Sequence, residues 1–326
     1  MSHELDMSNG RANMAYVGET PWHGLGFEID PDSSIEQWQT VAGMDWEVKK
    51  APVQYRVGSS WKKMDERSVL YRSDTEEGLG VMSSRYIPVQ PKEILEFYRT
   101  LVDGSGFKLE TAGCLFGGRK YWALAKTGDE SRIMGQDAMK GYLMLGSSVD
   151  GSMSTIAKFT SVRVVCNNTL QMAVYDEANQ KATDCIRIPH NTAFDANRVK
   201  AQLGLAHDSW QVFMEDVNNM AKVTLSNQEA LQYFINVLGN PAKPFEEQAS
   251  LKTIQRVFQL YAGGGKGADY RSAQGTLWGA INAITEFTDH HATAKVQDNR
   301  LNSAWFGDNS VKKDRAWDEA RLLLAA

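Results

Sequence analysis

The sequence predicts an α+β fold, with antiparallel β-hairpins and helices in one part and only helices in the part that follows. Alternating apolar and polar residues with Gly-rich turn signals dominate residues 46–165. Apolar residues at helical spacing dominate residues 197–324. The 326 residues, 42% of them hydrophobic, can fill one large core or two smaller ones. We therefore expect a disordered tail over residues 1–15, an α+β core domain over 16–200 and a helical domain over 201–326.

The first part of the core domain is predicted to contain two helices and three strands. The expected elements are a helix over residues 34–42, strands over 46–57, 68–72 and 80–87, and a helix over 91–102. A serine at position 33 or 34 can cap the first helix through its hydroxyl. Pro91 begins the second helix, because proline is favoured in the first turn, and Gly104 ends it.

A second β region follows, with strands expected over residues 107–115, 120–126, 141–148 and 154–165. Two turn signals, residues 117–118 and 150–151, lie between these strands, and their glycines tolerate the positive φ of tight turns. Asn167 and Asn168 follow the last strand. Because asparagine is a favoured N-cap residue, we expect a helix from about this point to residue 180.

The rest of the chain follows helical periodicity. Helices are expected over residues 226–238, 245–262, 271–291 and 310–324. Ser226 and Glu229 have the spacing of a capping box at the start of the first of these. Three glycines at 263–265 predict a flexible loop between the second and the third.

The bulk composition excludes several classes of protein. There are three cysteines, none closely paired, so neither a disulfide framework nor a zinc site is expected, as in a reducing cytoplasm. No apolar run is long enough to span a bilayer, and the polar first ten residues lack the features of a secretion signal. We expect a soluble cytoplasmic protein with no membrane partner and no cofactor.

The net charge of −5 is unevenly distributed along the chain. Residues 44–163 hold 18 basic and 15 acidic residues, whereas residues 1–43 hold one basic and seven acidic residues. Binding of a single strand requires cations for phosphates and flat rings for bases, and this middle part has both. The expected binding residues are Arg119, Lys120, Tyr121, Trp122, Lys126, Lys158 and Arg163. A second cluster comprises Lys49, Lys50, Tyr55, Arg56, Trp61, Lys62 and Lys63. The alternative for both is a solvated sheet face.

Three other groups of residues could bind a ligand or serve the structure alone. Trp22 and His23 lie in a Gly-rich loop and either contact a ligand or pack into the core. The Asn167–Asn168 pair either binds an anion at a helix start or only caps that helix. A third group shares one helical face and either binds a metal or moves protons, or is only a solvated helix end or an interhelical hydrogen-bond cluster. Its members are Asn282, Glu286, Asp289 and His290. No residue is assigned a catalytic role.

Three segments carry a resemblance to a known family. Residues 16–26, 163–170 and 275–290 resemble signatures of the phage/plasmid-like protein family, a domain of unknown function numbered 932. The resemblance implies an origin in a mobile element and a bacterial cytoplasm, and it brings no catalytic residues. In the order of its elements, the core is also similar to phage single-strand annealing proteins, an analogy of topology that does not establish function.

Three functions therefore stay open. The first is binding of single-stranded DNA in the metabolism or recombination of a mobile element, by a chain that assembles with further copies of itself. The second is a scaffold or host-interaction protein without catalysis. The third is a metal-dependent enzyme that joins Trp22 and His23 to Glu286, Asp289 and His290.

Overall fold

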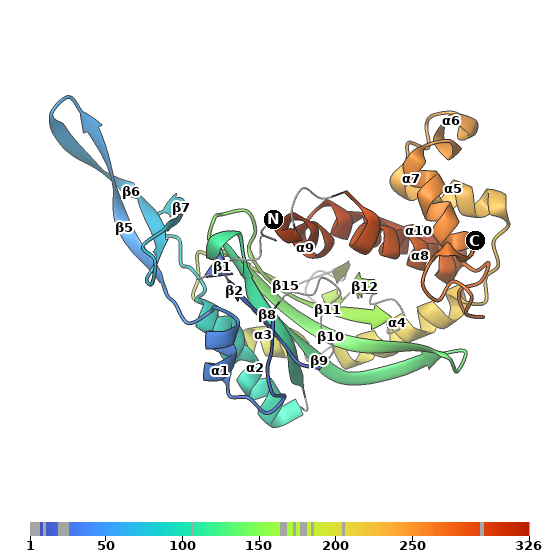
Figure 1. Cartoon of the computed structure of the whole chain (residues 1–326), viewed down its shortest axis with the longest axis horizontal. Coiled ribbons are helices and arrows are strands. Elements are labelled where there is room, and N and C mark those ends of the chain that lie inside the picture. The colour runs from blue at the N-terminus through green and yellow to red at the C-terminus, as the bar shows by residue number, and fades with distance from the viewer. Residues whose placement is uncertain are drawn as a thin grey trace. The chain divides into compact units, whose positions relative to one another are not determined.

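The computed structural model describes residues 7–8, 11–18, 26–105, 107–163, 168–171, 174–176, 181–183, 186–203, 206–293 and 297–325 (Figure 1). The chain forms two compact units that interleave along the sequence. The first unit comprises residues 1–128, 142–158 and 185–204, and the second comprises 129–141, 159–184 and 205–326. The domain boundary that we expect near residue 200 stays a prediction.

The described elements confirm the mixed α+β class, with sheets in the N-terminal half and mostly helices after residue 205. The strands are β1 (Met7–Ser8), β2 (Arg11–Ala12), β3 (Met14–Tyr16), β4 (Phe27–Glu28), β5 (Val48–Val57), β6 (Ser60–Arg72), β7 (Gly78–Ser83), β8 (Lys108–Leu115), β9 (Lys120–Ile133), β10 (Asp137–Ser148), β11 (Thr155–Arg163), β12 (Asn168–Gln171), β13 (Val174–Asp176), β14 (Lys181–Thr183) and β15 (Ile186–Ile188). The α-helices are α1 (Ile35–Val41), α2 (Pro91–Ser105), α3 (Ala196–Leu203), α4 (Ala206–Met220), α5 (Asn227–Leu238), α6 (Phe245–Ala249), α7 (Lys252–Gln259), α8 (Leu277–Glu286), α9 (Gln297–Phe306) and α10 (Asp308–Ala325).

The main sheet has the strand order β12-β11-β10-β9-β8-β3-β4, and β15 pairs with β11. Its pairings β3–β8, β8–β9 and β11–β12 are antiparallel, whereas β3 and β4 are parallel. A separate antiparallel sheet has the order β5-β6-β7. β9 is therefore an interior strand with a neighbour on each side, which bears on the predicted binding residues.

The N-terminal tail enters the structure earlier than we expect from sequence. Residues 14–16 form β3, which pairs with β8, and the side chains of Met14 and Ala15 are buried. The tail predicted over residues 1–15 is therefore corrected at its C-terminal end. The physical reason is that an apolar segment gains by covering the edge of β8, and no periodicity within three residues reveals such a partner.

Two helices of the first unit begin as predicted. The Ser34 hydroxyl accepts the backbone N–H of Gln37, and the Gln37 side chain accepts the Ser34 N–H, so a capping box starts α1. In α2, which begins at Pro91, the buried Tyr98 hydroxyl lies 3.0 Å from the carbonyls of both Ala123 and Leu143. This helix therefore packs against adjacent strands β9 and β10.

The helix predicted over residues 167–180 is wrong. In the described part of this segment the chain forms β12, β13 and β14, and β12 pairs back onto β11 with Asn168 opposite Arg163. Asparagine favours turns as well as helix caps, so the pair at 167–168 was an ambiguous signal. The backbone N–H and C=O groups at this edge of β11 are therefore paired by the strand β12.

The helix predicted to begin at residue 271 begins later. Gly275 has φ +68, and the Thr276 hydroxyl then accepts the Gly279 N–H and caps α8 at Leu277. A Cβ at Gly279 would lie 1.9 Å from the Ala273 carbonyl oxygen, so this glycine permits close backbone packing. The helix predicted over 245–262 is likewise divided into α6, α7 and a π-helical turn (Leu260–Gly264). Among the described residues, no helix is both long and apolar enough to cross a membrane.

Candidate functional site

The two rings predicted to stack on bases are not available to a ligand. Tyr121 and Trp122 follow each other on β9, so they point to opposite faces of the sheet. Tyr121 is 1% exposed and Trp122 is 0% exposed. The Tyr121 hydroxyl donates to the Val89 carbonyl, and a Cβ on Gly113 would lie 2.8 Å from the Trp122 ring. Both faces of β9 are covered here, and the prediction for these two residues is wrong.

The cations predicted beside those rings are also not assembled into an open surface. Lys120 and Lys158 are both buried, and burial lowers the pKa of Lys120, opposed by the charge of Asp150. Lys126 forms an ion pair with Glu110 at 2.8 Å. Arg119 is exposed, and its Nε donates to the Leu79 carbonyl. Arg163 lies on β11, and its side chain is outside the described residues. Among the described side chains of β9 and β11, the predicted cations therefore do not share one open surface with exposed rings.

Other predicted candidates lie partly beyond the described residues. Trp22, His23 and Asn167 are outside them, so the predicted loop site is not placed. Asn168 is on β12 instead of at a helix start, which removes the basis for an anion site there.

The residues predicted on one face of a long helix have separate structural partners. The Glu286 carboxylate accepts the Lys266 N–H at 2.9 Å, whereas Asp289 pairs with buried Lys313 at 2.8 Å. The Asn282 side-chain amide donates to the Trp278 carbonyl, and the His290 carbonyl accepts a bond from Arg300. Within the described part of the chain, no three metal-ligating side chains converge. Asn282 bonds within α8, whereas Asp289 and His290 bond to residues of α10 and α9, so these four residues do not share one site.

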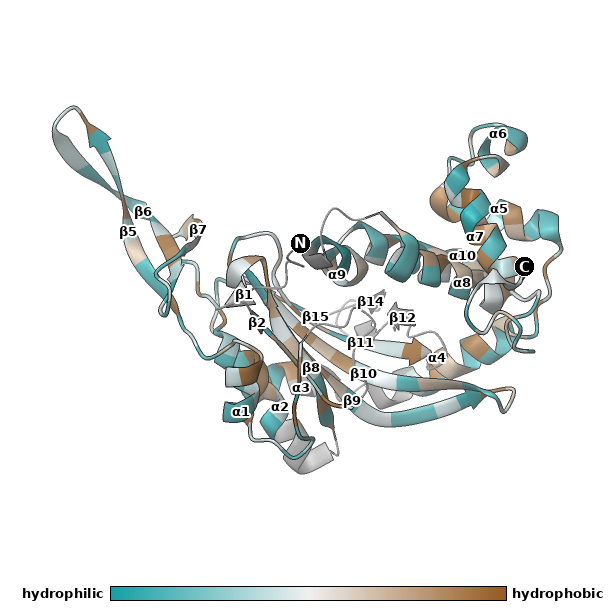
Figure 2. Ribbon diagram, in the orientation of Figure 1, coloured by the Kyte–Doolittle hydropathy of each residue, from teal (hydrophilic) through white to brown (hydrophobic). Residues whose placement is uncertain are grey.

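The β5–β6 hairpin has an exposed outer half. From Arg67 toward the turn, the two strands have no further partner strand among the described residues, because β7 pairs with β6 only over residues 67–71. We call residues 53–64 the ribbon tip. Gly58, with φ +61, lies in the two-residue turn between Val57 and Ser60. Figure 2 shows hydrophilic and hydrophobic residues mixed along this hairpin.

The ribbon tip carries large side chains that are open to solvent. Trp61 is 65% exposed and Tyr55 is 47% exposed. The other exposed apolar side chains of the ribbon tip are Val57 and Met64. A two-stranded ribbon has no core in which to bury such residues, so their side chains stay in contact with solvent. Exposed apolar side chains on one element make the ribbon tip a candidate binding surface.

The ribbon tip is also cationic. It contains Arg56, Lys62 and Lys63 and no acidic residue, within a chain whose net charge is −5. All three cations are exposed. Lys63 forms an ion pair with Asp65 at 3.0 Å, but both side chains are largely exposed, so solvent screens that pair. Positive charge and open rings therefore coincide on this element.

Both basic and aromatic clusters, the one on β9 and the one in the ribbon tip, could be recognised from sequence. One feature of the sequence distinguishes the buried cluster from the exposed one. Residues 121–125 are a continuous apolar run, Tyr-Trp-Ala-Leu-Ala, which is typical of a strand buried on both faces. In the ribbon tip, by contrast, charged residues occupy successive positions and therefore point to both faces. The apolar run predicts burial of Tyr121 and Trp122, which our assignment of the binding residues did not take into account.

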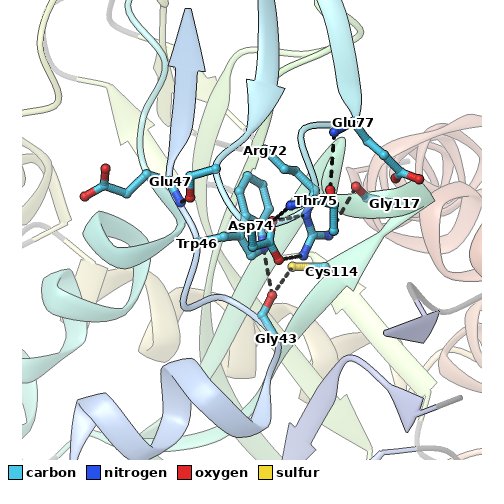
Figure 3. A network of polar contacts seen from close by, with 10 residues as sticks. Gly43, Trp46, Glu47, Arg72, Asp74, Thr75, Glu77, Cys114 and Gly117 are labelled. Carbon is cyan, nitrogen blue, oxygen red and sulfur yellow. Dashed lines mark hydrogen bonds and ion pairs between the residues drawn. The ribbon is translucent and has the colours of Figure 1, made fainter. Parts of the chain in front are cut away.

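A polar network attaches the hairpin to its unit at the inner end of β6 (Figure 3). The Arg72 guanidinium donates to both carboxylate oxygens of Asp74, at 2.9 and 2.8 Å, and to the Gly117 carbonyl. It also lies 4.4 Å from the centre of the Trp46 ring. The hydrogen bond from Arg72 holds the pKa of Asp74 below its usual value. The Trp46 indole N–H and the Cys114 thiol both donate to the Gly43 carbonyl.

A second polar cluster surrounds His190. Its Nε2 accepts the backbone N–H of Thr155 at 3.0 Å, which requires an unprotonated nitrogen there. Its Nδ1 then carries the hydrogen and donates to Tyr86, whose hydroxyl donates to the Ser148 carbonyl. Burial lowers the pKa of His190 and raises that of Tyr86. This cluster satisfies its own hydrogen bonds and holds His190 neutral.

Comparison with known protein families yields a match over most of the chain. A family described as "Domain of unknown function (DUF932)" matches residues 78–305, about two thirds of the chain. The match includes α2, β8 to β11 and most of the helical part, and it begins after the β5–β6 hairpin. No curated protein and no solved structure matches the chain.

Proposed function

The chain belongs to the DUF932 family, a domain of unknown function, and from this premise we propose that it binds single-stranded nucleic acid through the ribbon tip. Membership of the family assigns no activity, so the proposal rests on the surface of the molecule. The observation that carries it is Trp61, a largely exposed ring next to Lys62 and Lys63 in the ribbon tip, residues 53–64, which contains no acidic residue.

The chemistry of the ribbon tip is that of a single-strand binding surface. Cations neutralise phosphates and release counterions, while flat rings stack on bases of any sequence. The face of a base is free for stacking only where the strand is unpaired, so exposed rings favour single strands over duplexes. The resemblance to phage and plasmid proteins supports a role for this binding in the DNA metabolism of a mobile element in the bacterial cytoplasm.

The test is a titration of the protein into a labelled oligothymidylate, followed by fluorescence anisotropy at several salt concentrations. Arg56 and Lys63 lie on the same face as Trp61, so a strand stacked on that ring pairs about two phosphates, and log Kobs falls against log salt with a slope of about −1.4. Changing all three to Gln abolishes binding. Changing Trp61 to Thr weakens it by roughly 1–3 kcal/mol, the value of one stacked base, while the slope is retained.

The matched control changes three exposed lysines elsewhere, Lys222→Gln, Lys243→Gln and Lys252→Gln, and leaves both affinity and slope nearly unchanged. Absence of binding by the wild-type protein at low salt contradicts the proposal. Equal losses in the control and in the ribbon variants also contradict it, because binding would then depend on total charge. Tighter binding to a duplex of equal length would assign the surface to double-stranded nucleic acid.

A further inference from the structure

The register of the ribbon tip places a ring and a cation on each of its two faces. Arg56 lies directly opposite Trp61, and Tyr55 lies directly opposite Lys62. Directly opposed residues of an antiparallel pair share a face, with Cβ atoms about 4.5–5.5 Å apart. Successive residues of a strand point to opposite faces. The two ring–cation pairs therefore lie on opposite faces of the ribbon tip.

The first face combines Trp61 and Arg56 with the next opposed pair, Gln54 and Lys63. The Arg56 Nε donates to the Gly58 carbonyl, which orients the guanidinium within its own turn. A base stacked on the indole thus has two cations on the same face for the adjoining phosphates.

The second face combines Tyr55 and Lys62 with the opposed apolar pair Val53 and Met64. Tyr55 and Met64 are both exposed. This face has one cation and a larger apolar area, so it depends more on stacking and less on phosphate pairing than the first face.

Because both faces are open, we propose that one ribbon tip holds two nucleic-acid segments at once, one on each face. This inference rests on the proposed function and extends it from capture of a strand to the bridging of two strands. The ribbon itself separates the two segments, so bridging in this way requires no base pairing between them.

The test mixes two non-complementary oligothymidylates of about eight nucleotides, one with a donor dye and one with an acceptor dye, with the full chain. The length is short, so that one oligonucleotide cannot easily contact both faces. Wild-type protein is expected to bind two oligonucleotides per ribbon tip and to produce energy transfer between the dyes. Transfer should decline when protein is in excess, because each oligonucleotide then occupies its own protein.

Two variants each remove one face. The first is Arg56→Gln with Trp61→Thr, and the second is Tyr55→Thr with Lys62→Gln. Each is expected to bind one oligonucleotide per ribbon tip and to lose energy transfer. The control is Val81→Thr, an exposed position on β7 outside the ribbon tip, which should behave as wild type.

The outcomes separate this inference from the proposed function. One oligonucleotide per wild-type ribbon tip without transfer overturns two-faced binding and leaves single-strand binding intact. Energy transfer that persists in either one-face variant also overturns it, because bridging would then come from association between copies of the chain. No binding at all overturns both proposals.

Discussion

Gly118 determines how closely the backbone can approach Trp46 and Arg72 at the inner end of the β5–β6 hairpin. Its φ is +87, and a Cβ there would lie 2.6 Å from the Trp46 ring and 3.0 Å from the Arg72 guanidinium. Gly117, the preceding residue, also has a positive φ, +69, but a Cβ there would have no neighbour within 4 Å. Substitution of Gly117 tests backbone strain alone, whereas substitution of Gly118 tests strain together with a side-chain collision.

We expect Gly118→Ala to lower the free energy of unfolding by about 2–4 kcal/mol, as strain and overpacking combine. Gly117→Ala, which incurs the strain alone, should cost about 1 kcal/mol. Urea unfolding followed by tryptophan fluorescence measures both. Equal costs at the two positions would mean that Trp46 and Arg72 do not form the contacts described.

His190 makes the stability of the first unit depend on pH. Because burial lowers its pKa in the folded state, the unfolded chain binds a proton more readily. The stabilisation from neutral His190 is complete above the unfolded pKa of about 6.5 and is lost as pH falls below it. One proton limits the slope to about 1.4 kcal/mol per pH unit.

The measurement compares urea midpoints from pH 5 to pH 8 for the wild type and for His190→Gln. Gln can still accept the Thr155 N–H, but it does not titrate. The wild-type midpoint should fall relative to that of His190→Gln as pH falls from 7 to 5. A constant difference would show that His190 is not held neutral by its neighbours.

At the scale of elements, the ribbon tip should be dispensable for folding. Pro52 and Ser68 are directly opposed, so residues 53–67 can be replaced by Asn-Gly, a pair suited to a two-residue hairpin turn. Because the residues of the ribbon tip are mostly exposed, the thermal midpoint should stay within a few degrees of the wild-type value. Oligonucleotide binding should disappear. A shortened chain that fails to fold would contradict this assignment, and circular dichroism measures the outcome.

Elements with capping signals and long periodicity could be predicted from sequence. Ser34 begins α1, Pro91 begins α2 and Ser226 begins α5 as expected. The prediction failed where partners distant in sequence decide the conformation. The segment after β11 is strand because it pairs back onto β11, and Asn168 alone favours a helix cap and a turn equally.

At the scale of the molecule, the fold class and the family could be recognised from sequence, while the binding surface could not be located from charge and aromatic content alone. Tyr121 and Trp122 lie beside cations in the sequence just as Trp61 does, yet Tyr121 and Trp122 are buried and Trp61 is exposed to solvent. The difference depends on which strands have neighbours and on what covers each face. Those are properties of the assembled sheet.

The family match begins at residue 78, after the hairpin, so the ribbon tip is not part of the matched domain. The β5-β6-β7 sheet nevertheless joins the two, because β7 begins at Gly78 and pairs with β6. The proposed binding element is thus connected to the matched domain through both the chain and a shared sheet.

The two-stranded ribbon tip leaves backbone N–H and C=O groups unpaired along its outer margins within the described residues. Such margins can add a strand from another molecule and so promote self-association. Arg56, Lys62 and Lys63 oppose this by mutual repulsion between molecules. Ionic strength should therefore act on this hairpin in two ways: added salt should weaken the proposed binding of nucleic acid, and it should also weaken the repulsion between ribbon tips of different molecules.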